Sequence, residues 1–280
     1  MGFKKFSDLV MIEQTLFALP FAWLGVLFAG GGDFITWVWV TIALFAARTA
    51  GMSFNRYIDR AIDARNPRTK GRALPAGAMK PGDVLMLGIG SSALLVLSAL
   101  MLNSLCFYLS FPAIVLLYTY SYFKRFTSAS HFYLGFVEAA APVGGYLAVT
   151  GEIELLPFLL GAVIMLWIAG LDVVYALLDV DFDRKEGLFS IPARLGRKRA
   201  LAISIASYGC AVALLVAAGV ITARGIPFWV AVFSTAIIFY RQQSLARTGD
   251  PATAVNEFFL LNRFVSPVLF AGTFVDVFFR

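Results

Sequence analysis

Two short stretches of this apolar chain carry carboxylates at helical spacing. In NRYIDRAIDAR (55–65) the residues Asn55, Asp59 and Asp63 follow one another at intervals of four, so on a helix they form one stripe. In DVVYALLDVDFDRK (172–185) the spacing again predicts one helical stripe, formed by Asp172, Tyr175, Asp179 and Asp183. If the two helix ends are neighbours, we expect four carboxylates to converge: Asp59, Asp63, Asp179 and Asp183.

Convergent carboxylates repel one another and cannot all stay ionised unless cations lie between them. Oxygen-only donors suit hard metals, and Mg²⁺ typically binds one or two carboxylates together with substrate phosphates. Both stretches also adjoin basic residues that can hold phosphate oxygens: Arg65, Arg68, Lys70, Arg72, Arg184 and Lys185. The pair of stripes predicts a magnesium–diphosphate site, whereas either stripe alone is more often a solvated helix end.

The chain that positions these residues has the composition of a membrane protein. Of its 280 residues, 60% are hydrophobic and 14% charged, whereas soluble domains are about 45–50% apolar and about 25% charged. We therefore expect one polytopic transmembrane domain spanning 1–280, without a cleavable signal peptide. Both cysteines lie inside apolar runs, and we interpret them as packing residues. The small residues of APVGGY (141–146) favour close helix packing.

Apolar runs recur that are long enough to cross a bilayer, which takes roughly 20 helical residues. They predict an all-α fold of about nine transmembrane helices with short connections, near 9–29, 34–54, 83–103, 105–122, 132–150, 156–178, 200–221, 226–240 and 256–277. The third and fourth are separated by a tight turn at Asn103–Ser104, and the eighth is short.

The distribution of charge predicts the orientation of these helices. If successive connections alternate between two faces, one face holds 19 of the 23 lysines and arginines and both carboxylate stretches. The other face holds the connections 30–33, 150–154 and 223–225, with Arg224 as their cation. By the positive-inside rule, the N-terminus and both charged loops face the cytoplasm across the cell membrane. This placement also explains the net charge of +6 without a nucleic-acid partner.

Three segments resemble the UbiA superfamily of intramembrane aromatic prenyltransferases. NRYIDRAIDARNPRTKGRALPAG resembles its first signature, DVVYALLDVDFDRKEGLFSIPARLG its second, and YTYSYFKRFT (118–127) the segment between them. The resemblance covers nearly the whole chain in helix count, motif order and separation. It implies helices around a central cavity open to lipid, with both Asp-rich motifs on cytoplasmic cap loops.

The resemblance also implies a reaction and the residues that carry it. Two Mg²⁺ ions hold a polyprenyl diphosphate, whose ionisation gives an allylic cation that an aromatic acceptor attacks. Carried over by motif, the metal ligands are Asn55, Asp59, Asp63, Asp179 and Asp183. Diphosphate and substrate contacts are Arg68, Arg72, Lys124, Lys185 and Tyr118. Asp172 and Tyr175 are placed near the acceptor as catalytic residues, and Arg125 is a candidate to bind the acceptor's carboxylate.

One departure from the family pattern concerns the metal ligands. Many members carry Asn-Asp where this chain has Asn55–Arg56, so one potential ligand is missing. The second motif resembles most closely the bacterial branch that prenylates 4-hydroxybenzoate or related quinone precursors. The alternative acceptor is 1,4-dihydroxy-6-naphthoate, used in the futalosine route to menaquinone. Both are carboxylated phenols, and the residues do not separate them.

Two other classes of membrane protein use paired carboxylates. A carrier with an acidic ion path places them at the bilayer midplane in broken helices, whereas here they lie beside basic loops. A CDP-alcohol phosphotransferase needs Asp-Gly and Ala-Arg elements in one contiguous motif, and these are not present.

The single histidine, His131, is expected to hydrogen-bond the neighbouring loop, with general-base catalysis as the alternative. Arg48 and Asp172 lie inside apolar runs and are candidate partners of the carboxylate cluster.

Overall fold

The computed structural model describes residues 3–248 and 251–279, and within these ranges every regular element is a helix. The first half of the chain forms α1 (Phe3–Val10), α2 (Ile12–Phe28), α3 (Phe34–Arg65), α4 (Pro81–Leu102), α5 (Ser104–Phe123), α6 (Ser130–Glu138) and α7 (Ala140–Thr150). The second half forms α8 (Leu155–Tyr175), the 3₁₀ turn η1 (Ala176–Asp179), α9 (Val180–Glu186), α10 (Ile191–Ile221), α11 (Ile226–Thr248) and α12 (Pro251–Phe278).

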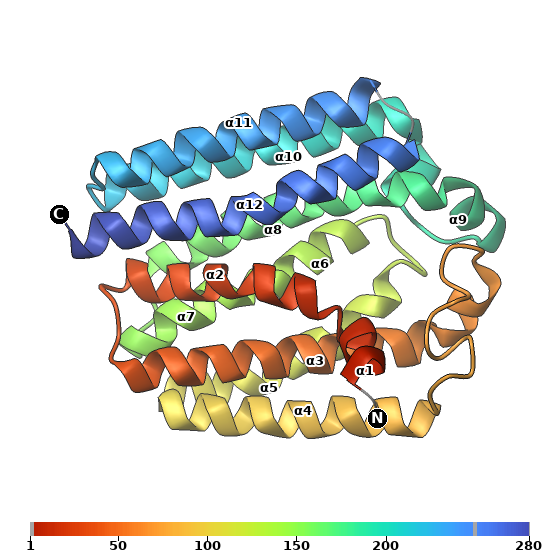
Figure 1. Ribbon diagram of the computed structural model, residues 1–280, viewed down its shortest axis with the longest axis horizontal. Helices are drawn as coiled ribbons and strands as arrows, with labels where there is room; N and C mark the ends of the chain where they lie inside the picture. Colours follow the sequence, from red (N-terminus) through yellow and green to blue (C-terminus); the bar gives the residue numbers. More distant parts are fainter. Residues whose placement is uncertain (1–2, 249–250, 280) are drawn as a thin grey trace.

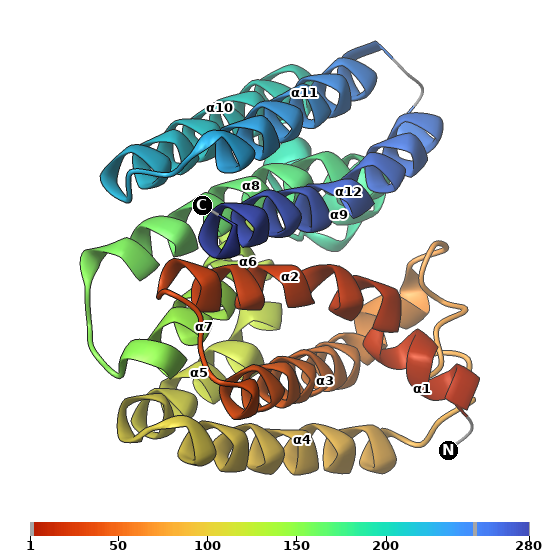
Figure 2. The ribbon, with the colours of Figure 1, turned by 60° about the vertical axis from the view of Figure 1, so that its left-hand side comes forward.

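Helix contacts close a ring that follows the order of the chain. α3 packs on α2 and α4, α5 on α4 and α6, α8 on α6 and α10, and α11 on α10 and α12. α12 returns to α2, which closes the ring, and α7 packs against α2 and α8 (Figures 1 and 2). The prediction of helices arranged around a central cavity is confirmed.

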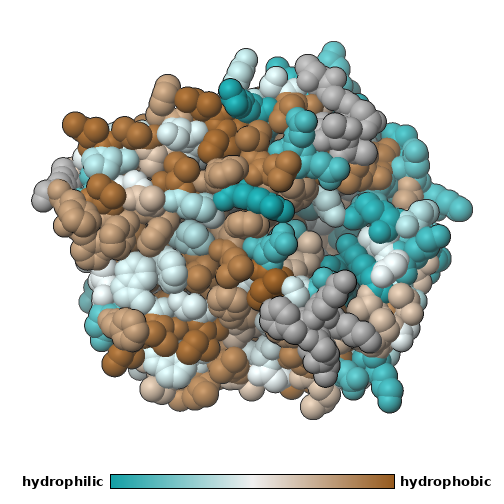
Figure 3. All heavy atoms as spheres, in the orientation of Figure 1, coloured by the Kyte–Doolittle hydropathy of each residue, from teal (hydrophilic) through white to brown (hydrophobic). Residues whose placement is uncertain are grey.

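The surface has the polarity of a multi-pass membrane protein. In the described part of the chain, seven helical segments are long and apolar enough to cross a membrane. α2, with 17 residues, is shorter, and α11 is not among the seven, so the count of nine stays a prediction. Figure 3 shows apolar side chains over much of the bundle and hydrophilic ones gathered at the end where α9 and the 66–80 connection lie in Figure 1.

Several boundaries differ from the predicted ones for local reasons. The predicted apolar run ends at residue 54, but α3 continues to Arg65. The helix stops there because Pro67 disfavours helical backbone in Asn66, the residue before it. The first carboxylate stripe therefore lies on the last turns of one long helix, as its spacing predicts. The run 132–150 is divided between α6 and α7. Pro142 has no N–H to donate to the carbonyl of Glu138, so the ladder is interrupted there.

Glycines allow α2 and α7 to pack backbone against backbone. A Cβ atom on Gly145 would lie 2.0 Å from the carbonyl oxygen of Ala22, and one on Gly25 would lie 2.1 Å from that of Pro142. Such close approach is typical of small residues between membrane helices. The predicted close packing of the 141–146 segment is confirmed.

Substituting Gly145 by alanine tests this contact. We expect Gly145→Ala to lower the free energy of unfolding by about 1–3 kcal/mol, because the two backbones must separate to admit the methyl group. The measurement is the thermal unfolding midpoint in detergent. Gly144→Ala is the matched control, since nothing lies within 4 Å of a Cβ atom at that position. Equal midpoints for the two variants would contradict the contact.

Candidate functional site

A cavity of about 590 Å³ lies inside the ring of helices. Its lining comes from α2, α3, α5, α6, α7, α8, η1, α9, α12 and the loops beside them. Most of the predicted site residues line it together: Asn55, Asp59, Asp63, Arg68, Arg72, Lys124, Asp172, Tyr175, Asp179 and Asp183. The sequence therefore predicted residues that share one cavity, although the contacts among them differ from those expected.

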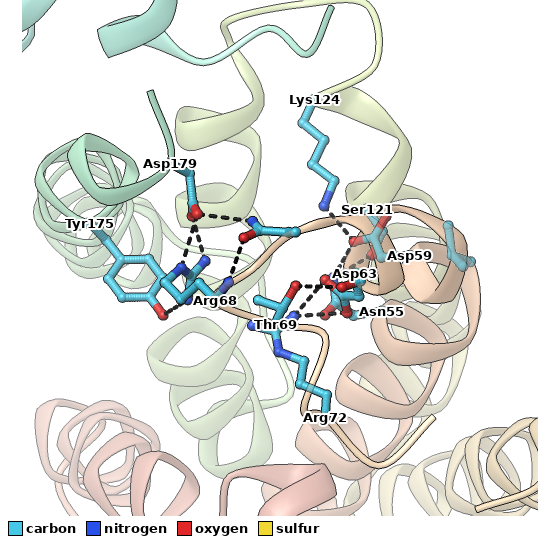
Figure 4. A network of polar contacts seen from close by, with 12 residues as sticks. Asn55, Asp59, Asp63, Arg68, Thr69, Arg72, Ser121, Lys124, Tyr175 and Asp179 are labelled. Carbon is cyan, nitrogen blue, oxygen red and sulfur yellow. Dashed lines mark hydrogen bonds and ion pairs between the residues drawn. The ribbon is translucent and has the colours of Figure 1, made fainter. Parts of the chain in front are cut away.

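The first carboxylate stripe is buried and neutralised by cations from elsewhere in the chain. Asp59 is 1% exposed. Its Oδ2 accepts hydrogen bonds from Lys124 Nζ at 2.7 Å and Asn55 Nδ2 at 3.0 Å, and its Oδ1 accepts one from Arg125 Nη2 at 3.2 Å. One turn later, both oxygens of Asp63 accept from Arg72 Nη1 at 2.9 Å. The end of α5 and the 66–80 connection thus supply the charges that allow this stripe to be buried (Figure 4).

The second stripe does not lie on one regular helix, so that prediction was wrong. α8 ends at Tyr175, Asp179 closes the 3₁₀ turn η1, and Asp183 lies on α9. A 3₁₀ turn winds three residues per turn instead of 3.6, which shifts the direction of the side chains that follow it. Asp172, Tyr175, Asp179 and Asp183 nevertheless all line the same cavity.

Arg68 connects the loop after the first motif to the second motif. Its Nε donates to Asp179 Oδ1 at 3.0 Å, its Nη2 to Asp179 Oδ2, and its Nη1 to the hydroxyl of Tyr175 at 2.5 Å. Asn66 Nδ2 donates to the same Asp179 oxygen at 3.0 Å, while Asn66 Oδ1 accepts from the backbone N–H of Arg68. Burial disfavours the guanidinium charge, but the hydrogen bonds to Asp179 and Tyr175 and the charges of these two groups together outweigh it and raise the pKa of Arg68. The two motifs are therefore held together by the chain's own cations (Figure 4).

The carboxylates form two separated groups instead of one cluster. Within the described residues, no three side chains of His, Cys, Asp or Glu lie close enough to hold a metal ion jointly. The four carboxylates that were expected to converge do line one cavity, but they do not meet at one point: Asp59, Asp63 and Asp179 are each paired with a cation, namely Lys124, Arg72 and Arg68. The donor set still fits Mg²⁺: it consists of oxygen atoms, with one or two carboxylates on each side of a space that can admit phosphate.

His131 links the wall of the cavity to the start of α10. Its Nε2 accepts a hydrogen bond from the backbone N–H of Ile191 at 3.1 Å, so the ring hydrogen must be on Nδ1. Nδ1 then donates to Asp172 Oδ2 at 2.7 Å. The hydrogen bonds of the His131 ring thus go to α10 and α8 instead of the neighbouring loop that was expected, and the imidazole fixes the orientation of Asp172.

An ion pair that sequence reasoning missed lies further along α3. Arg48 pairs with Glu138, the last residue of α6, and both side chains line the cavity. Arg48 is seven residues before Asn55, which places the pair roughly 10 Å closer to the opposite end of the bundle. The suggestion that Arg48 is a partner of the carboxylate cluster was wrong, because Glu138 neutralises it locally.

Three predicted substrate contacts do not line the cavity. Lys185 is exposed on α9, and Arg125 reaches Asp59 from outside the lining. Tyr118 is 41% exposed, and its ring packs edge-on against Phe54. Conversely, sequence reasoning overlooked lining residues that include Asn66, whose position three residues after Asp63 continues the first stripe.

Comparison with known proteins adds independent observations. The model of the UbiA prenyltransferase family matches residues 18–264. The 4-hydroxybenzoate octaprenyltransferase of Aromatoleum aromaticum is 33% identical over 273 residues, which cover 98% of this chain and 90% of the relative. The enzyme of the same name from Nitrosomonas europaea is 30% identical over 277 residues, covering 99% and 92% of the two chains.

Solved structures show the same fold. The apo structure of a UbiA homolog from Aeropyrum pernix K1 superposes with a TM-score of 0.88 at 36% identity, covering 95% of this chain and 98% of that one. A UbiA homolog from Archaeoglobus fulgidus, bound to GPP and Mg²⁺, superposes with a TM-score of 0.73 at 20% identity, covering 97% and 100%. The second similarity concerns the fold alone.

Proposed function

The chain belongs to the UbiA prenyltransferase family, and on this premise we propose that it transfers a polyprenyl group from a polyprenyl diphosphate to 4-hydroxybenzoate in quinone biosynthesis. The observation that carries the proposal is the cavity, in which two acidic motifs with their cations meet between apolar walls. The names of the relatives that match nearly the full chain support the choice of acceptor. We further propose that the motif loops face the cytoplasm, from the distribution of positive charge.

We propose that Asn55, Asp59 and Asp63 on one side, and Asp179 and Asp183 on the other, hold two Mg²⁺ ions. When bound, the metal neutralises negative charge that develops on the departing diphosphate. Arg68, Arg72 and Lys124 line the same cavity, and their N–H groups can bind phosphate oxygens with charge-assisted hydrogen bonds. In each of these ion pairs, the carboxylate is thus proposed to bind the metal and the basic side chain to bind the diphosphate.

The remaining lining residues fit the second half of the reaction. The C–O bond of the prenyl diphosphate breaks, the electron pair leaves with the diphosphate oxygen, and a ring carbon of the acceptor bonds to the allylic cation. The ring proton then passes to the released diphosphate, which restores aromaticity. Apolar side chains such as Phe21, Trp167 and Phe259 line the cavity and exclude water from the cation. We propose that Asp172, oriented by His131, accepts a hydrogen bond from the acceptor's hydroxyl group.

The test is an assay on membranes that contain the protein. They are incubated with a polyprenyl diphosphate, Mg²⁺ and either 4-hydroxybenzoate or 1,4-dihydroxy-6-naphthoate, and products are identified by mass spectrometry. We expect a prenylated 4-hydroxybenzoate. A product formed only from the naphthoate would retain the chemistry and correct the acceptor. With intact protein present, the lack of product from any carboxylated phenol would refute the proposed function.

A further inference from the structure

Arg56 is buried in the wall of the cavity. It lies on the same face of α3 as Asp59 and Asp63, which follow it by three and seven residues. The residue is 7% exposed, and its side chain belongs to the lining of the cavity. Asp63 is near enough to act on its charge, but Arg72 already holds both oxygens of that carboxylate.

The other cationic side chains of the lining all have a carboxylate partner. Among the described residues, each lysine or arginine that lines the cavity forms an ion pair except Arg56; the pairs are Arg48–Glu138, Arg68–Asp179, Arg72–Asp63, Lys124–Asp59 and Arg263–Glu13. Within the described residues, no hydrogen bond joins the Arg56 guanidinium to another residue. Burying a charge without a partner is costly, and it persists in membrane proteins mainly where it serves function.

We propose that Arg56 binds a diphosphate oxygen of the prenyl donor directly, so that part of the substrate's charge is held without a metal ion. The inference rests on the proposed function and adds a residue to it. A guanidinium at this position binds phosphate oxygens through its own N–H groups. A carboxylate at the same position, as in the family pattern, holds an anion only through an intervening metal. Arg56 is therefore proposed as a ligand of the substrate and not of a metal.

This assignment predicts diphosphate binding that survives chelation. The probe is inorganic diphosphate, titrated calorimetrically into the full-length protein in detergent with excess EDTA. We expect the wild-type protein to bind, Arg56→Gln to bind at least about tenfold more weakly, and Arg56→Lys to recover most of the loss, because its charge is kept. Arg60→Gln is the matched control. Arg60 lies one turn later on α3 but is exposed and donates to the backbone carbonyl of Tyr57.

Thermal stability separates a binding role from a structural one. Because Arg56 has no partner, we expect Arg56→Gln to unfold at the same temperature as the wild-type protein or higher when no anion is present. Added diphosphate should raise the midpoint of the wild-type protein by more than that of the variant. An arginine needed for packing would show the opposite pattern, with a lowered midpoint and unchanged diphosphate binding.

Three further outcomes distinguish a failure of the Arg56 proposal from a failure of the proposed function. If the wild-type protein binds diphosphate with Mg²⁺ but not in EDTA, the role of Arg56 is overturned and the proposed function stands. If Arg56→Gln binds in EDTA as tightly as the wild-type protein, the role of Arg56 is likewise overturned. If the wild-type protein binds no diphosphate even with Mg²⁺, the proposed function itself fails.

Discussion

Asp59→Asn and Asp179→Asn each lower the rate of prenyl transfer by on the order of 10³-fold or more, while the protein stays folded. An amide keeps the size of the side chain but carries no charge, so it cannot balance Mg²⁺ beside a departing diphosphate. The two carboxylates lie in separate groups of the cavity, so losing either one leaves the diphosphate neutralised on one side only. The measurement is turnover of the purified variants, normalised to folded protein.

The control for this pair is Asp181→Asn. Asp181 lies between Asp179 and Asp183 in the sequence but is exposed on α9 and does not line the cavity. We expect this variant to keep wild-type turnover. The folded state of all three variants is checked by their unfolding midpoints. Near wild-type activity in Asp59→Asn or Asp179→Asn would show that the two-motif metal site is wrong.

Removing divalent cations abolishes turnover without unfolding the protein. Turnover is lost because neither acidic group can then act on the diphosphate through a metal. The fold is kept because the chain's own cations neutralise the carboxylates: Lys124 pairs with Asp59, Arg72 with Asp63 and Arg68 with Asp179. Bare carboxylates in the same places would repel one another and destabilise the metal-free protein.

The measurement combines turnover and thermal unfolding before and after EDTA, followed by titration with Mg²⁺. We expect the unfolding midpoint to change little and turnover to return as Mg²⁺ is added. Turnover that persists in EDTA would contradict the metal requirement. A large fall in the midpoint on chelation would instead show that the ion pairs do not compensate for the metal. Diphosphate binding in EDTA reports substrate binding without metal, and turnover in EDTA reports prenyl transfer. The two measurements together therefore separate binding from reaction.

The positions of the helices followed from local information. Apolar runs located nearly all the long helices, and Asn103 marked the turn between α4 and α5, where its Oδ1 accepts from the backbone N–H of Cys106. The break at Ala139 and the 3₁₀ turn after Tyr175 did not follow from the hydrophobic pattern. The sequence stays apolar through both breaks. The first depends on Pro142, and the second depends on packing against other helices.

Which residues line the site was predictable, but which residues pair was not. The spacing of Asp59 and Asp63 placed both on one face of one helix, and that is a property of the helix alone. Their partners come from the 66–80 connection and from the end of α5, so the pairing depends on how distant segments pack. Tyr118 and Lys185 illustrate the reverse case: each lies within or next to a motif, yet neither side chain faces the cavity.

Because Arg48 and Glu138 neutralise each other, the two ends of the cavity differ in charge. The wall around this pair carries no net charge, whereas the motif end contains Arg56 and the carboxylates that are proposed to hold Mg²⁺. On the proposed function, with Mg²⁺ bound, a prenyl diphosphate therefore lies with its head towards the loops and its tail towards the neutral wall. On the proposed reaction, the released diphosphate then departs into water and the lengthened quinone precursor into the bilayer, so the two products separate as they form.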